Sequence, residues 1–241
     1  MLFRSNHNTI LINGVGQENF GRAESVEWTQ PATGNTDMSK QAVLTAYKRT
    51  PAITVIEGEA AGSYIAKNGV RPALERFRRT FVWVEGKYIL VLDDIRAPEK
   101  VKIDWLLQGR KIDTIDAPAM RYKLVADNNE SCAFQITADK TFAKDFRAAP
   151  ADDRGNALGH RQLVLTAEAD KLRFASVYAP WGGDYVLKVD WTDPASARIT
   201  ITKDGAPASI WQWKTATSPA IPSSLVTPGF ALTPADKAPA P

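Results

Sequence analysis

The chain has few of the residues that build disulfides and metal cages. Cys132 is the only cysteine among 241 residues, and His7 and His160 are the only histidines. A single thiol excludes an intramolecular disulfide and a cysteine-based metal site. Because Cys132 lies in the alternating run CAFQIT, we expect a buried thiol rather than a nucleophile. The sequence also has no Ser/His/Asp order typical of a catalytic triad, no glycine-rich phosphate loop and no His-x-x-x-His pair.

Long apolar runs and a strong excess of one charge are missing as well. No run approaches the roughly 18 apolar residues of a membrane span, so we predict no membrane-spanning segment. The net charge of +3 favours acidic partners slightly. It is far from the clustered basic face of a nucleic-acid binder, and we expect no nucleic-acid partner.

Apolar residues recur with period two, which predicts strands rather than helices. In VKIDWLLQ, the residues Val101, Ile103, Trp105 and Leu107 share one face of a half-buried strand. Short strands with little helical pattern between them predict an all-β fold, a large antiparallel β-sandwich of two sheets. The predicted strands are 9–12, 42–47, 53–58, 76–84, 88–95, 101–108, 121–126, 132–137, 162–167, 172–178, 185–191, 198–202 and 209–213.

Two segments differ in composition from the predicted sandwich. Residues 143–159 are polar and rich in turn formers, which predicts an exposed loop. From residue 215 onward the chain is rich in Pro, Ala, Ser and Thr, which predicts a flexible, disordered tail. We therefore predict a β-sandwich domain at residues 1–214 and a C-terminal tail at residues 215–241. The pair Asp204-Gly205 predicts a hairpin with a loop longer than two residues.

A polar cluster around His7 runs directly into an apolar strand and a turn. This stretch, SNHNTILINGVGQ, resembles a strand motif of the heparinase II/III-like polysaccharide lyases, and the matching residues are Ser5, His7, Asn8, Thr9, Gly14 and Gln17. Residues 78–109 resemble the long hairpin of the same family through Arg79, Tyr88, Asp93 and Trp105. Together with the rhythm of the strands, the resemblance extends over about residues 5–213.

The resemblance implies that this chain is the C-terminal β-sandwich of a longer lyase whose N-terminal helical toroid is absent from it. Such enzymes cleave uronic-acid-containing polysaccharides, heparan sulfate-like or alginate-like, by β-elimination. A base removes the weakly acidic C5 proton while the carboxylate charge is neutralised. The family takes those groups mainly from the toroid. The expected partners are therefore an acidic polysaccharide and the missing helical domain, and the isolated chain is expected to be inactive.

The resemblance also implies a metal site and a location. His7 would be a zinc ligand in the intact parent, together with a His and an Asp from upstream. Without the resemblance, His7 is a polar histidine that bonds to backbone at a strand start. A lone imidazole does not make a zinc site, so we expect no zinc in the isolated chain. Asn8 and Gln17 would support His7. For Gln17 the alternatives are contact with a sugar and, the one we favour, closure of the Asn13-Gly14 turn. The family implies a periplasmic or secreted parent, although the chain carries no recognisable signal peptide.

Three residues are predicted to bind substrate. Arg76 and Arg78 fall on one face of a strand, with Arg79 on the other. The guanidinium group of an arginine can pair with the carboxylates of a polyuronate. The alternative is that these arginines are solvated charges that keep a sheet edge from pairing with other chains. Trp181, in APWGGDY, either stacks on a sugar or caps a turn. The alternative function is a non-catalytic carbohydrate-binding or interaction sandwich.

Overall fold

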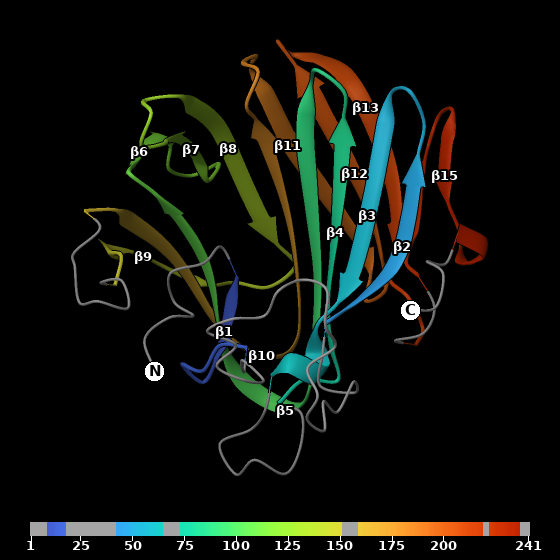
Figure 1. Ribbon diagram of the computed structural model, residues 1–241, viewed down its shortest axis with the longest axis horizontal. Helices are drawn as coiled ribbons and strands as arrows, with labels where there is room; N and C mark the ends of the chain where they lie inside the picture. The colour runs from blue at the N-terminus through green and yellow to red at the C-terminus, as the bar shows by residue number, and fades with distance from the viewer. Residues whose placement is uncertain (1–8, 18–41, 65–72, 151–158, 219–221, 237–241) are drawn as a thin grey trace, which may run out of the picture.

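The computed structural model describes residues 9–17, 42–64, 73–150, 159–218 and 222–236 (Figure 1). Within these ranges the chain forms two antiparallel sheets of ten and five strands, which confirms the all-β sandwich. The only helical elements described are two short 3-10 turns, η3 (Ala61–Ser63) and η4 (Pro234–Asp236). No helix in the described ranges is long and apolar enough to cross a membrane.

The larger sheet is built around two neighbouring long strands. Its order is β2 (Val43–Arg49), β3 (Ile53–Glu59), β4 (Arg76–Val84), β5 (Tyr88–Gly109), β10 (Arg161–Ala179), β8 (Ser131–Ala138), β7 (Arg121–Val125) and β6 (Lys111–Asp116). In addition, β1 (Ile10–Ile12) pairs with β5, and β9 (Ala143–Ala148) pairs with β10. In Figure 1, β2 to β4 lie on the right and β6 to β9 on the left.

The smaller sheet covers one face of the larger one. Its order follows the chain: β11 (Tyr185–Asp193), β12 (Ser196–Lys203), β13 (Ala206–Lys214), β14 (Ser224–Thr227) and β15 (Phe230–Leu232). We call the face of the ten-stranded sheet that packs on these strands the inner face, and the opposite one the outer face. Because side chains alternate along a strand, neighbouring residues of β4 and β5 serve different faces.

Two apolar cores result from this alternation. The inner-face core lies between the sheets and includes Leu90, Leu92, Ile199, Trp211 and Trp213. The outer-face core extends along β5 and β10 on the opposite face, and its buried members include Ile10, Ile103, Trp105, Leu165 and Phe174. The strands β5 and β10 contribute to both cores, so they hold the two halves of the molecule together.

Each long strand was expected as two shorter ones. The structure has one strand of 22 residues, β5, where the sequence predicts 88–95 and 101–108, and one of 19 residues, β10, where it predicts 162–167 and 172–178. Alternation breaks near Pro98 in β5, and the register with β10 shifts between Ala169 and Lys171. A bulge interrupts the apolar pattern while the strand continues, and this explains the wrong division.

Two predictions of unstructured segments are wrong in part. Residues 143–148 form β9, which pairs with the start of β10, although residues 151–158 lie outside the described ranges. The predicted tail contains β14 and β15, which extend the five-stranded sheet from β13. Beyond them, Asp236 accepts a hydrogen bond of 2.9 Å from Lys48 in β2. Short strands carry too few alternating residues to stand out among prolines and serines.

Two asparagine or aspartate turns fix hairpins of the fold. Asn13 and Gly14 have φ angles of 50° and 78°, and Ile12 and Val15 exchange backbone hydrogen bonds around them. Asp204 and Gly205 also have positive φ angles, and Lys203 pairs directly with Ala206. The second hairpin therefore has a two-residue loop rather than the longer loop predicted. Positive φ at both central positions gives the twist that suits adjacent strands, and asparagine, aspartate and glycine tolerate it.

Side chains also join the two sheets. The Gln135 amide of β8 donates to the Leu187 carbonyl at 3.0 Å and accepts from its N–H at 2.8 Å, which imitates a strand pairing. Arg173 of β10 pairs with Asp139 and donates to the carbonyls of Asp193 and Ser196 in the β11–β12 turn. These contacts fix the smaller sheet on the inner face.

Candidate functional site

Three residues that carry the family resemblance meet on the outer face. The Arg79 guanidinium donates to both carboxylate oxygens of Asp93, at 2.7 and 2.8 Å. The indole Nε1 of Trp105 donates to the same carboxylate at 2.9 Å. The three come from β4 and from two distant points of β5, so the sheet brings together what the sequence separates. We call this group the Arg79–Asp93–Trp105 cluster.

The cluster is a fixed ion pair. Burial alone would lower the pKa of Arg79, but the charge and hydrogen bonds of Asp93 outweigh it, and the pKa is raised above its ordinary value. The side chain of Asp93 is buried, and that of Arg79 is only 18% exposed. A bidentate pair of this kind holds its geometry well. It presents little free positive charge to a ligand because Asp93 already neutralises Arg79.

The N-terminal motif enters the same face. Ile10 of β1 pairs with Trp105 of β5, and Thr9 shares a hydrogen bond of 3.1 Å with the Tyr64 hydroxyl. Tyr64 also donates to the Ile10 carbonyl at 3.3 Å. The motif strand is therefore anchored next to Trp105, one member of the Arg79–Asp93–Trp105 cluster. His7 and Asn8 lie outside the described residues.

Two phenols accompany the cluster, and both are protonated at neutral pH. Burial raises the pKa of Tyr64 to about 12. Burial also raises the pKa of Tyr178 on β10, although Arg79 acts in the opposite direction. A protonated phenol donates hydrogen bonds and is not a base. Among the described residues, the outer face thus offers donors and a fixed ion pair, but no histidine for proton abstraction.

Within the described residues, the structure shows no set of ligands for the predicted zinc site. No group of three His, Cys, Asp or Glu side chains there could hold a metal ion. The second histidine, His160, contacts Asp127 at 2.9 Å. Cys132 is half-buried, and burial raises the pKa of its thiol to about 11, so it is neither a thiolate nucleophile nor a thiolate ligand. The described residues alone do not fit zinc.

A stripe of exposed apolar side chains runs beside the cluster on the outer face. In the sheet register Tyr47 lies opposite Ile56, and Ile56 lies opposite Phe81. Trp83 follows Phe81 by two positions on the same face of β4. The Trp83 and Trp181 rings stack, with centroids 5.8 Å apart and an angle of 22° between their planes. We call these five residues the apolar stripe.

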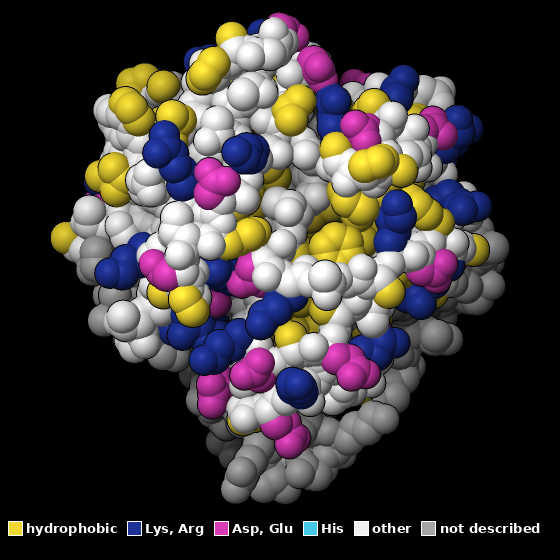
Figure 2. Space-filling view, turned by 180° about the vertical axis from the view of Figure 1, so that it is seen from behind, with side chains coloured by type: hydrophobic (Ala, Val, Ile, Leu, Met, Phe, Trp, Pro, Cys, Tyr) yellow, Lys and Arg dark blue, Asp and Glu magenta, His cyan; other side chains and the backbone are white. Residues whose placement is uncertain are grey.

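The apolar stripe is unusual because all its members are large and open to solvent. Their exposed fractions lie between 42% and 49%. Scattered single apolar residues are normal on a surface, whereas a contiguous group marks a contact site. For comparison, Figure 2 shows the molecule from behind the view of Figure 1, with apolar side chains between charged side chains of both signs. Of the predicted substrate-binding residues, Trp181 belongs to the stripe.

Arg76 and Arg78 do share one strand face, as expected, but it is the inner face. They are only 3% and 1% exposed, and no guanidinium is presented to a ligand from outside. Arg76 pairs with Asp94 at 2.9 Å, and Arg78 lies 3.5 Å from both Glu57 and Glu59. Their burial contradicts both the predicted substrate contact and its alternative, a solvated edge.

The buried charges hold the segment that follows β13. Arg76 donates to the Ala216 carbonyl, and the Ser223 N–H donates to Glu57 at 3.0 Å. Arg96, which contacts Asp94, donates to Thr215 at 2.9 Å. The arginines therefore fix the connection between β13 and β14. Sequence reasoning missed this role because the acidic partners lie on other strands.

Gln17 is half-buried three residues after Gly14 of the Asn13-Gly14 turn. The turn is closed by backbone bonds between Ile12 and Val15, and Asn13 accepts a bond from the Lys102 N–H at 3.0 Å. Gln17 is not needed to close it. Whether Gln17 supports His7 stays a prediction, because His7 is outside the described residues.

Comparison with known proteins gives a distant structural relationship. No family model matches the sequence, and no curated protein matches it. Among solved structures, a heparinase III, the BT4657 gene product, matches with a TM-score of 0.60 and 13% identity over 87% of this chain and 30% of its own. The heparan sulfate lyase HepC from Pedobacter heparinus gives a TM-score of 0.59 and 13% identity, over 84% of this chain and 29% of its own.

Another heparinase III structure gives a TM-score of 0.58 and 13% identity, over 86% of this chain and 29% of its own. At this identity the likeness shows a shared fold. The chain spans less than a third of the length of the solved structures it matches.

Proposed function

We propose that this chain is the β-sandwich part of a polysaccharide lyase that cleaves uronic-acid-containing polysaccharides, heparan sulfate-like or alginate-like, by β-elimination. The observation that carries the proposal is the fold shared with heparan sulfate lyases over most of the chain. The Arg79–Asp93–Trp105 cluster supports it, because three of the residues that carry the sequence resemblance form one connected group, and Trp105 pairs with the motif strand.

In this proposal the outer face forms one wall of the substrate cleft. Trp83 and Trp181 offer flat apolar rings for sugars, and Tyr178 of β10 contributes a protonated phenol to the same face. β-Elimination needs a base for the C5 proton and a group that neutralises the carboxylate. The Arg79–Asp93–Trp105 cluster supplies neither in free form, so a helical partner domain provides both. The isolated chain is then inactive.

The reading frame around the coding sequence gives the first test. An in-frame helical domain upstream, with a His and an Asp as further ligands, supports the proposal, and its absence refutes the proposal. The joined protein is then incubated with heparan sulfate, heparin and alginate. Ultraviolet absorbance of the unsaturated uronate product measures elimination, and the chain without that domain serves as the control.

Zinc and location belong to the same proposal. His7 would bind zinc with ligands from the helical domain, and zinc would stabilise the junction of the two parts. Metal analysis of the joined protein and of its His7→Ala variant tests this, with equal zinc content in both as the contradicting result. Cell fractionation tests whether the parent is periplasmic or secreted.

The alternative is a carbohydrate-binding sandwich without catalysis. The apolar stripe favours it, because sugar rings stack on exposed aromatic side chains whether or not a reaction follows. The two functions differ in one measurement. Binding of polysaccharide without unsaturated product, in a protein that includes all flanking coding sequence, identifies the alternative.

A further inference from the structure

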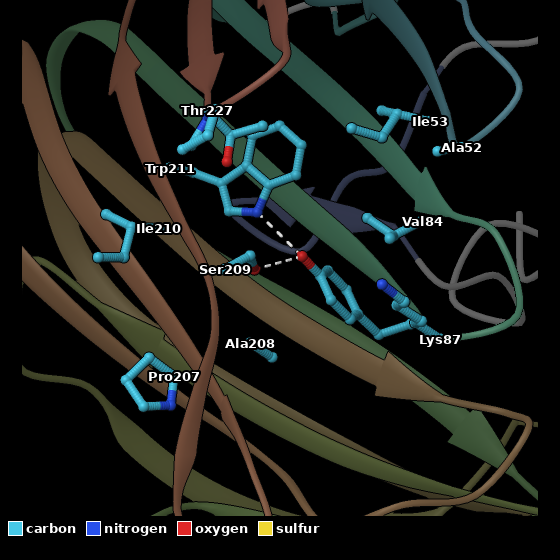
Figure 3. Close-up of a pocket in the computed structure, with 12 residues that line it drawn as sticks. Ala52, Ile53, Val84, Lys87, Pro207, Ala208, Ser209, Ile210, Trp211 and Thr227 are labelled. Atoms are coloured by element: carbon cyan, nitrogen blue, oxygen red, sulfur yellow. Dashed lines mark hydrogen bonds between the residues drawn. The ribbon is translucent and has the colours of Figure 1, made fainter.

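A cavity of about 390 Å³ opens between the two sheets, away from the outer face. It lies where the β4–β5 hairpin approaches β13 and the β14–β15 turn (Figure 3). Its volume falls within the range of roughly 300–1,000 Å³ that is typical of small-molecule sites. Its apolar walls include Ile53, Val84 and the Trp211 ring. Tyr88, one of the residues that carries the sequence resemblance, also lines it.

The hydroxyl groups in the cavity leave one donor unused. Tyr88 and Ser209 share a hydrogen bond, and Trp211 Nε1 donates to the Tyr88 oxygen at 3.0 Å (Figure 3). The two hydroxyls carry two hydrogens, and their mutual bond uses one. Whichever of them donates, the other O–H has no partner among the described residues. Burial raises the pKa of Tyr88, so the phenol keeps its hydrogen.

The mouth of the cavity carries one positive charge. Lys87, in the β4–β5 turn, is the only charged residue among the lining side chains, and none of them is acidic. Lys87 is exposed, and no ion pair joins it to any other described residue. An anion at the mouth therefore meets an ammonium group without a competing carboxylate.

We propose that this cavity binds a small cyclic carboxylate that also carries a ring or substituent oxygen. Its ring packs against Trp211 and Val84, its carboxylate pairs with Lys87, and its oxygen accepts the spare O–H of the Tyr88–Ser209 pair. A uronic acid and a hydroxylated aromatic acid share this chemistry. The proposal is independent of the proposed function, because the cavity lies between the sheets and includes no residue of the outer face.

The test uses the full chain and four probes in calorimetric titration. The probes are D-glucuronate and 4-hydroxybenzoate, with their neutral amides, D-glucuronamide and 4-hydroxybenzamide. We expect at least one acid to bind and its amide to bind about tenfold more weakly. Lys87→Met should remove that difference. Lys123→Met changes another exposed lysine, on β7 outside the cavity, and should bind as the wild type does.

Ala208→Trp fills the cavity from an exposed position on β13 and should abolish binding while the thermal transition is retained. Ser209→Ala keeps the Tyr88 O–H as a donor, so its binding should fall less than that of Lys87→Met. Binding of glucuronate alone identifies a sugar acid as the ligand type, and binding of 4-hydroxybenzoate alone identifies an aromatic acid. The proposal is overturned if neither acid binds at millimolar concentration, if each amide binds as well as its acid, or if folded Ala208→Trp binds unchanged.

Discussion

Arginine side chains have different roles on the two faces of the ten-stranded sheet. On β4, Arg76 and Arg78 point to the inner face, where they are buried and pair with acidic residues of β3 and β5. Arg79, one position further, points to the outer face and holds Asp93 beside the motif strand. The inner-face charges fasten the chain to itself, whereas the outer face combines a fixed ion pair with exposed rings. Adjacent arginines therefore serve stability on one face and the candidate site on the other.

The largest effect should follow a change on the inner face. Arg78→Met leaves Glu57 and Glu59 buried without their nearest cation, and we expect a loss of about 3–5 kcal/mol in the free energy of unfolding. Urea denaturation measures it. Arg198→Met, at an exposed position of β12, should change stability by less than about 0.5 kcal/mol. Equal stabilities of the two variants would contradict the role given to the buried charges.

A smaller loss should follow on the outer face. Asp93→Asn keeps the size of the side chain but removes the charge that pairs with Arg79 and weakens the acceptor for Trp105. We expect a loss of about 2–3 kcal/mol in the free energy of unfolding, a smaller loss than on the inner face because Arg79 retains some contact with solvent. The near-ultraviolet circular dichroism should change too, since Trp105 loses its fixed orientation. A loss larger than that of Arg78→Met would reverse the comparison of the two faces.

The pH dependence of stability should identify Tyr64. Burial raises the pKa of Tyr64 to about 12 from its ordinary value of about 10, so the folded protein favours the neutral phenol. This stabilisation is present below pH 10 and is lost as pH rises from 10 to 12. The difference between the folded and the ordinary pKa corresponds to about 2–3 kcal/mol in the free energy of unfolding.

Tyr64→Phe should reduce the alkaline loss by about this amount, and it should cost about 1 kcal/mol at neutral pH through the Thr9 bond. The measurement is the urea midpoint at pH 8 and pH 11, and at pH 11 about half of this loss, roughly 1.4 kcal/mol, is expected. Tyr47→Phe, on the exposed stripe, is the control and should leave both midpoints unchanged. An alkaline loss in Tyr64→Phe as steep as in the wild type would show that other groups cause it.

The smallest effect on stability should accompany the largest effect on sugar binding. Trp181→Ala removes an exposed ring, so we expect a change of less than about 1 kcal/mol in the free energy of unfolding. Affinity for an acidic oligosaccharide should fall several-fold, because the stacked surface with Trp83 is lost. Affinity electrophoresis measures it. Ile115→Ala, an exposed apolar position on β6, should bind as the wild type does.

The sequence predicts a strand well where its apolar residues alternate clearly. The strand β4, for example, begins and ends where the pattern predicts. The sequence also predicts that Arg76 and Arg78 share a face, but it does not show which face is covered. Burial depends on the register of β3, which places Glu57 opposite Thr80 and Glu59 opposite Arg78. This pairing is a long-range property that no local pattern contains.

The candidate site illustrates the same limit. Arg79, Asp93 and Trp105 are predicted as residues of one motif, but their contact requires the fold of β4 on β5 and the bend of β5. The stack of Trp83 on Trp181 joins β4 to the turn after β10, two segments that no local spacing relates. The cavity at Tyr88 depends on β13 and on the β14–β15 turn, and the sequence predicts a disordered tail in place of that turn.

The two long strands have a consequence for how the molecule forms. Since β5 and β10 pass through both cores, neither core can separate from the other without breaking the central ladder. Their pairing joins points as far apart as Ile89 and Tyr178, and contacts between such distant residues make folding slow. We expect the protein to unfold in a single transition, with the amides of this central pair as the last to exchange with solvent.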